Sequence, residues 1–149
     1  MRVGIRLGVV TNHDLFQGAA DRHGKYGNGH MVVNTNGRRC VCGSDGCVHT
    51  YSTILALKSE IIEKIKCGHS SLLMEHVENP EDIDFDSICL AVEKDDALCT
   101  TILKDFGYHT GIAVSNIFAL LQPDLVILGG PMYHRFDLFY QTVVQTATE

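Results

Sequence analysis

The segment Gly29-His30, followed ten residues later by Cys40-Val41-Cys42-Gly43-Ser44-Asp45-Gly46-Cys47, decides how this chain is interpreted. One imidazole and three thiols fall within eighteen residues, and the cysteines follow a C-x-C-x4-C pattern. Four nitrogen and sulfur donors are what a closed tetrahedral zinc site requires, and glycines let so short a loop bring its sulfurs to one point. The pattern predicts a structural Zn2+ site with the ligands His30, Cys40, Cys42 and Cys47.

A disulfide or a set of unpaired thiols are the alternatives to a metal. Cys40 and Cys42 are poorly placed to bridge each other, with one residue between them. The remaining cysteines lie at irregular spacing on apolar, helix-like stretches, where buried free cysteine is common: Cys67, Cys89 and Cys99. No signal peptide opens the chain, which indicates a reduced, cytoplasmic setting. A cysteine cluster there more often binds a metal than forms a disulfide.

Length and composition are those of one globular domain. The chain has 149 residues, which is long enough for one domain with a hydrophobic core. Its composition, 45% hydrophobic and 20% charged, is ordinary for a globular protein. No apolar run approaches the roughly 20 residues that cross a bilayer, so we expect no membrane span. The net charge is −6, and Arg38-Arg39 is the only tight basic pair. We therefore expect no direct binding to DNA or RNA.

The first third of the chain has the pattern of short strands and loops. Residues 2–10 are rich in β-branched residues and glycine and predict a strand. Residues 11–14 predict a turn, and the chain then returns from Leu15 as the second strand of a hairpin. Residues 18–29 are polar and glycine-rich and predict a loop, and residues 31–33 predict a short strand before the cysteine loop.

Helical periodicity begins near Tyr51, where apolar residues recur at three and four positions opposite charged ones. Helices are expected from there to Gly68, around Leu72 to His76, from Asp84 to about Val92, from Asp95 or Asp96 to a stop before Gln122, and from Phe136 to about Ala147. The longest of them carries an apolar stripe that predicts a core face, with a subunit interface as the alternative.

The run Asp124-Leu125-Val126-Ile127-Leu128 is short, almost wholly apolar and closed by Gly129-Gly130. Following a helix, it predicts a strand that is covered on both faces. The expected order is hairpin, cysteine loop, helices, buried strand and helix, which is an α/β fold.

Four stretches of this sequence resemble the ROK family of bacterial sugar kinases and sugar-responsive repressors. They are Gly29–Val33, the C-x-C-G-x-x-G-C loop, Gln122–Gly130 and the hairpin stretch Gly8–Ala19. The resemblance implies an α/β fold of the actin-like ATPase (ribonuclease-H-like) type. Residues 1–149 would form a single domain, most of the C-terminal lobe, with an inserted zinc loop at about residues 29–48.

The resemblance also implies that the N-terminal lobe is absent from this chain, together with its phosphate-gripping hairpin and catalytic aspartate. We therefore expect a fragment without catalytic residues. The family has a sugar-binding glutamate three residues before the zinc histidine and another two residues after the last zinc cysteine. Here these positions are Gly27 and His49.

The two histidines of this region keep several roles open. His30 is a zinc ligand in the family, and its neighbourhood also touches sugar hydroxyls, so a sugar contact by His30 is implied. His49 is a candidate hydrogen-bond donor to a sugar, a substitute metal ligand, or a partly exposed histidine at a helix start.

Glycines at two places match the family's nucleotide contacts. Gly4 and Gly8 match the turn that meets ATP phosphates, although Val3 replaces its threonine, and Arg2 and Arg6 replace glycines. Arginine side chains would crowd the backbone approach on which such a turn depends. The pair Gly129 and Gly130 matches the adenosine-side turn, with a simple strand end as the alternative.

Three functions follow from these expectations. The first is a non-catalytic effector and oligomerisation lobe of a ROK-type transcriptional regulator, stabilised by zinc, with a sugar or sugar phosphate as effector and copies of itself as partners. The second is a fragment of a glucokinase-like or N-acetylhexosamine kinase that uses ATP and Mg2+. The third is a structural zinc domain that pairs with a separately encoded partner.

Overall fold

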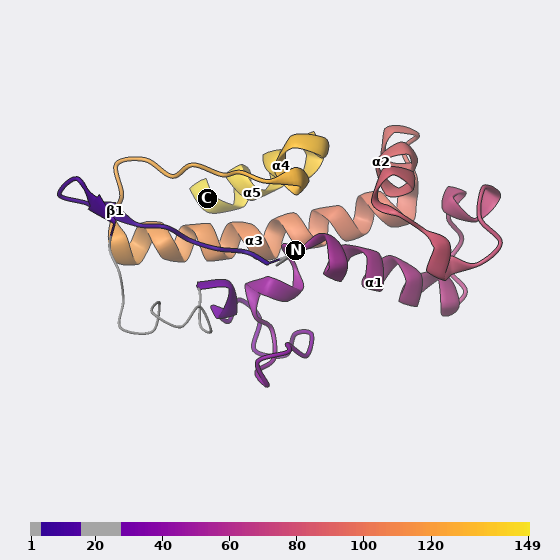
Figure 1. Cartoon of the computed structure of the whole chain (residues 1–149), viewed down its shortest axis with the longest axis horizontal. Helices are drawn as coiled ribbons and strands as arrows, with labels where there is room; N and C mark the ends of the chain where they lie inside the picture. Colours follow the sequence, from indigo (N-terminus) through magenta and orange to yellow (C-terminus); the bar gives the residue numbers. More distant parts are fainter. Residues whose placement is uncertain (1–3, 16–27) are drawn as a thin grey trace.

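The computed structural model describes residues 4–15 and 28–149, and its regular structure is mostly helical (Figure 1). The helices are α1 (Ile54–Lys66), α2 (Phe85–Glu93), α3 (Ala97–Leu121), α4 (Pro131–Arg135) and α5 (Asp137–Thr148). The strands are β1 (Val10–Thr11) and β2 (Asp14–Leu15), and the short 3-10 helices are η2 (Asn28–His30), η3 (Val48–Thr50), η4 (Leu72–Glu75) and η5 (Pro80–Asp82). The predictions for Arg2, Val3, Gly27 and most of the loop 18–29 lie outside the described residues.

The long helices begin at the capping residues that the sequence predicts. Asp84 accepts a hydrogen bond from the Ser87 backbone N–H at 2.8 Å at the start of α2, and Asp96 accepts one from Cys99 N–H at 2.8 Å at the start of α3. Such bonds satisfy backbone donors that have no partner within the helix. The predicted helices 84–92, 96–121 and 136–147 are confirmed to within a residue or two, and α4 is an additional helix.

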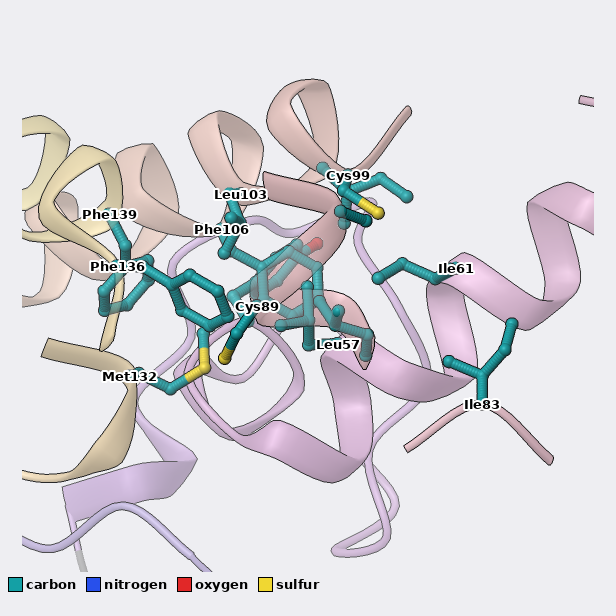
Figure 2. Close-up of a cluster of buried hydrophobic side chains, with 14 of the residues drawn as sticks. Leu57, Ile61, Ile83, Cys89, Cys99, Leu103, Phe106, Met132, Phe136 and Phe139 are labelled. Carbon is teal, nitrogen blue, oxygen red and sulfur yellow. The ribbon is translucent and has the colours of Figure 1, made fainter. Parts of the chain in front are cut away.

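Helices α3 and α5 lie side by side and supply much of the core (Figure 1). Glycines set how closely they approach, because a Cβ at Gly107 would lie 2.7 Å from Thr142 Cβ and one at Gly111 would lie 2.5 Å from Thr146 Cβ. Figure 2 shows the buried side chains that α1, α3 and the α4–α5 region bring together, among them Leu57, Leu103, Phe106, Phe136 and Phe139. The apolar stripe predicted for 96–121 is a core face over most of its length, since Ile102, Leu103, Phe106, Ala113 and Val114 are buried.

Asp96 joins the start of α3 to η4. Besides capping α3, its carboxylate accepts hydrogen bonds from Leu72 N–H at 2.7 Å and from the Ser71 hydroxyl at 3.0 Å, and the residue is only 3% exposed. Burial alone would raise the pKa of Asp96, but the bonds from the Cys99 and Leu72 N–H groups outweigh it and lower the pKa below its usual 3.8.

We expect the stability that the Asp96 charge contributes to be lost in acid. Because the pKa is lower in the folded state, the unfolded chain binds more protons near pH 4, so this contribution is complete above the unfolded pKa and falls as pH drops through the folded one. Asp96→Asn keeps a capping group without the charge and should lower the free energy of unfolding by about 1–2 kcal/mol at pH 7. Urea denaturation of both proteins between pH 7 and pH 3 should show the difference shrinking towards pH 3. A difference that stays constant with pH would contradict the assignment.

The N-terminal strand predictions are confirmed only at the turn. Val10 pairs with Leu15 and Thr11 with Asp14, around Asn12 and His13, whose φ angles are +51° and +66°. Two residues with positive φ make a tight hairpin turn of the kind that matches strand twist. Residues 4–9 are not in a paired strand, and the predicted strand 31–33 is reduced to a single bridge between Val32 and Cys47. These two predictions were wrong in extent.

The prediction of a strand at 124–128 that is covered on both faces is also wrong. Val126 and Leu128 pack against the core, but Leu125 is 73% and Ile127 is 84% exposed. A strand needs a neighbour that accepts and donates its backbone hydrogen bonds. Within residues 4–15 and 28–149 no strand pairs with this segment, so it runs past α3 and α5 as an extended segment with one free face.

Candidate metal centre

The donor atoms of His30, Cys40, Cys42 and Cys47 all lie within 4.8 Å of one another. His30 Nδ1 is 3.4 Å from Cys40 Sγ, and Cys42 Sγ is 3.5 Å from Cys47 Sγ. In a tetrahedral zinc site with bonds of about 2.0–2.3 Å, neighbouring ligand atoms are about 3.5–3.8 Å apart. Two donor pairs are close to that spacing and the others lie within 4.8 Å, so the four predicted ligands are near enough to share one metal ion. Three thiols with one imidazole are one of the donor sets of structural zinc sites.

Backbone hydrogen bonds and glycines fold the loop that carries these ligands. Val33 N–H donates to Gly46 O at 2.8 Å and Gly46 N–H donates to Arg38 O at 2.8 Å, so the two ends of the loop are held together. At the tip, Cys40 N–H donates to Ser44 O at 2.9 Å. Gly46 has φ +68° and leaves no room for a side chain, because a Cβ would lie 1.5 Å from Asn34 O.

Arg38 attaches this loop to the helices. Its guanidinium bonds Glu60 of α1 and Asp105 of α3, each at 3.1 Å, and lies 4.5 Å from the centre of the Tyr51 ring and 4.7 Å from that of Phe106. Ion pairs to two helices combined with cation–π contacts fix the side chain more firmly than one exposed pair would. The sequence alone identifies Arg38 only as one half of a basic pair. Its ion-pair and cation–π partners lie 13 to 68 residues away along the chain and therefore leave no local pattern.

The neighbouring thiols have opposite pKa shifts. A hydrogen bond from the Ser44 backbone is the main reason that the pKa of Cys42 falls to about 7, whereas burial is the main reason that the pKa of Cys47 rises to about 12. A bound cation favours the thiolate form of a cysteine ligand and so opposes the effect of burial at Cys47. Coordination by all three sulfurs would couple the loop to the metal.

His49 lies beside this cluster but outside it. The centre of its ring is 5.6 Å from that of His30, and burial, followed by the neighbouring His30, lowers its pKa. A Cβ at Gly4 would lie 3.7 Å from His49 Cε1, so the N-terminal segment passes close to this ring. His49 is not among the four clustered donors, and the predicted sugar contacts of His30 and His49 stay predictions.

Three of the four predicted nucleotide-contact glycines line one cavity. Gly4, Gly129 and Gly130 border a cavity of about 520 Å³ between the N-terminal segment, α3 and residues 126–133, and Gly8 does not. Arg6 also lies at its edge, and the walls are mostly apolar.

No helix in the described part of the chain is both long and apolar enough to cross a bilayer.

Known structures share this architecture over nearly the whole chain. A ROK family transcriptional regulator, a homolog of the Escherichia coli MLC protein, is 27% identical with a TM-score of 0.78 over 95% of this chain and 34% of its own. The ROK hexokinase of Thermus thermophilus is 18% identical with a TM-score of 0.79 over 97% of this chain and 44% of its own, which is a likeness of fold alone. These matches support the predicted actin-like ATPase architecture.

The chain belongs to the ROK family, whose model matches residues 2–149. Among relatives, the xylose repressor of Caldicellulosiruptor bescii is 27% identical over 93% of this chain, and the DNA-binding transcriptional dual regulator NagC of Escherichia coli is 28% identical over 85% of it. The chain spans 34% and 30% of these two proteins, about a third of their length.

Proposed function

We propose that this chain is the zinc-stabilised effector and oligomerisation lobe of a cytoplasmic ROK-type transcriptional regulator and that it has no catalysis of its own. The observation that supports this proposal most is that the chain is more similar in sequence to transcriptional regulators than to a sugar kinase. A xylose repressor and the regulator NagC match it at 27% and 28% identity, whereas the hexokinase matches at 18%. In this proposal the DNA-binding part lies outside residues 1–149, which fits their net charge of −6.

The zinc in this proposal is structural. His30, Cys40, Cys42 and Cys47 would fill all four positions of a tetrahedral ion, and a closed site has no position for substrate or water. Its bound ion would hold together a loop that buries few apolar side chains. Arg38 would then carry this rigidity to α1 and α3.

The residues at the family's sugar-binding and phosphate-binding positions support the proposal that this chain has no kinase activity. At the position of a sugar-binding glutamate of the family, His49 offers a half-buried imidazole, and burial lowers its pKa, which favours the neutral form. A carboxylate can accept two hydroxyl groups at once, but a neutral imidazole accepts only one. Arg6 stands where the phosphate turn of the family has a glycine, and we assign no catalytic residue.

Oligomerisation is proposed through the free apolar surface near the end of α3. Leu120, Leu121, Leu125 and Ile127 are each at least half exposed, and Phe118 is 39% exposed. Exposed apolar side chains that gather on one surface mark a contact site when they form a large patch. The partner in this proposal is a second copy of the chain, and a sugar or sugar phosphate is the effector.

The alternative function is a fragment of a ROK sugar kinase that uses ATP and Mg2+. It is favoured by one observation, the cavity that Gly4, Gly129 and Gly130 border. Phosphoryl transfer also requires a base and a clamp on the transferred phosphate, and we have assigned neither to this chain.

Calorimetry separates the two functions. The protein is titrated with glucose, N-acetylglucosamine, N-acetylmannosamine and ATP with Mg2+. For ATP we expect no binding with a Kd in the micromolar range, because Arg6 crowds the phosphate-binding turn. Micromolar ATP binding that Gly129→Val abolishes would support the kinase and overturn the proposal. Gly129 is a suitable site because a Cβ there meets nothing within 4 Å. Light scattering of the same samples should show an oligomer, and a strict monomer would contradict the oligomerisation role.

A further inference from the structure

The three cysteines of the centre differ in how far solvent reaches them. Cys40 is 4% exposed and Cys47 is fully buried, whereas Cys42 is exposed, as are all residues from Val41 to Asp45 around it. The tip of the loop therefore presents one sulfur to reagents in solution and keeps the others behind it.

Cys47 is the sulfur that lies within reach of Cys42. Their Sγ atoms are 3.5 Å apart, and a disulfide needs about 2.05 Å, so a shift of about 1.5 Å suffices. Cys42 is exposed and lies outside the hydrophobic core, so no core packing opposes that shift. Cys40 is the poorer partner because only one residue separates it from Cys42 and its sulfur contacts His30.

We infer that Cys42 and Cys47 form a reversible disulfide when the centre meets a peroxide and that this pairing releases the metal. The inference rests on the zinc site of the proposed function and adds a modification site to it. Loss of both sulfurs from the metal leaves His30 and Cys40, and two ligands do not close a tetrahedral site.

The chemistry balances with hydrogen peroxide as the oxidant. The Cys42 thiolate attacks one peroxide oxygen, the O–O bond breaks, and Cys42 sulfenic acid and hydroxide form. The Cys47 thiolate then attacks the Cys42 sulfur, the S–S bond forms, the S–O bond breaks, and a second hydroxide leaves. Two thiolates supply the two electrons that peroxide takes up, and buffer protons convert both hydroxides to water. A dithiol reductant reverses the step by exchange.

The experiment treats zinc-loaded protein with hydrogen peroxide and follows zinc release with a chromogenic chelator and disulfides by peptide mapping. Metal analysis comes first, since protein without zinc would defeat the proposed function and leave the thiol pairing to be tested separately by mapping. We expect one zinc released per chain, a Cys42–Cys47 linkage, and recovery of zinc binding after a dithiol. Zinc retained through complete oxidation of Cys67, or a linkage of Cys40 instead of Cys42, would overturn the inference.

Two variants sharpen the test. Cys67→Ser removes the other exposed cysteine, at the end of α1, and should leave zinc release unchanged. Cys42→His keeps a zinc ligand but removes the exposed sulfur, so release by peroxide should slow at least tenfold. Release from Cys42→His at the rate of the unmodified protein would overturn the inference. If Cys42→His binds no zinc, the peptide map of the unmodified protein decides.

Discussion

Replacing Cys42 by serine is expected to lower the melting temperature of the zinc-loaded protein by about 10 °C or more. Structural zinc contributes on the order of 10 kcal/mol of apparent binding energy in small zinc peptides, and a lost thiolate forfeits much of it. In a domain of this size about 3 °C corresponds to each kcal/mol. Cys42 is exposed and lies outside the hydrophobic core, so the effect would come from the metal and not from packing.

Cys67→Ser is the matched control, because Cys67 is also exposed and lies outside the four-residue centre. It should leave the melting temperature nearly unchanged. In the presence of a strong chelator, the unmodified protein and Cys42→Ser should melt at the same temperature, since the metal that distinguishes them is gone. Calorimetric melting with and without chelator checks both expectations. An unchanged melting curve after chelation would mean that the centre holds no stabilising ion.

The helices could be predicted from sequence because their signals are local. Asp84 and Asp96 mark helix starts, Gly68 follows the end of α1, and periodic apolar residues mark the buried faces. The extended segments could not be predicted in the same way, since a strand depends on a neighbour in space. Residues 124–128 have the composition of a buried strand, yet no strand pairs with them among the described residues.

The candidate metal centre likewise combines local features that the sequence predicts with long-range contacts that it does not predict. Its four donors are close in sequence, and the loop that gathers them is short, so their pattern predicted the cluster that the structure shows. Its attachment was missed because Arg38 meets Glu60 and Asp105, which lie far along the chain. The stacking of Tyr51 on His109, with ring centres 4.1 Å apart, likewise joins the loop region to α3 without any local signal.

Gly46→Ala should destabilise the loop far more than a surface substitution does, by about 3 kcal/mol or more. The methyl group would lie 1.5 Å from Asn34 O and 2.5 Å from Asn34 C, and a backbone cannot yield as the end of a flexible side chain can. Overpacking costs about 1–3 kcal/mol, and a positive φ without glycine adds about 1–2 kcal/mol. Relief of the clash would also break the bond from Val33 N–H to Gly46 O and displace the adjacent Cys47.

Gly43→Ala separates the clash from the backbone strain. Gly43 also has a positive φ, +95°, but a Cβ there meets nothing within 4 Å, so this substitution should cost only about 1–2 kcal/mol. Denaturation of the zinc-loaded proteins, with zinc content measured on the same samples, compares the two. Gly46→Ala should lose zinc affinity as well as stability, because Cys47 moves, whereas Gly43→Ala should keep its zinc. Equal losses in the two variants would mean that Asn34 does not confine Gly46 and that the two ends of the loop are not held together as described.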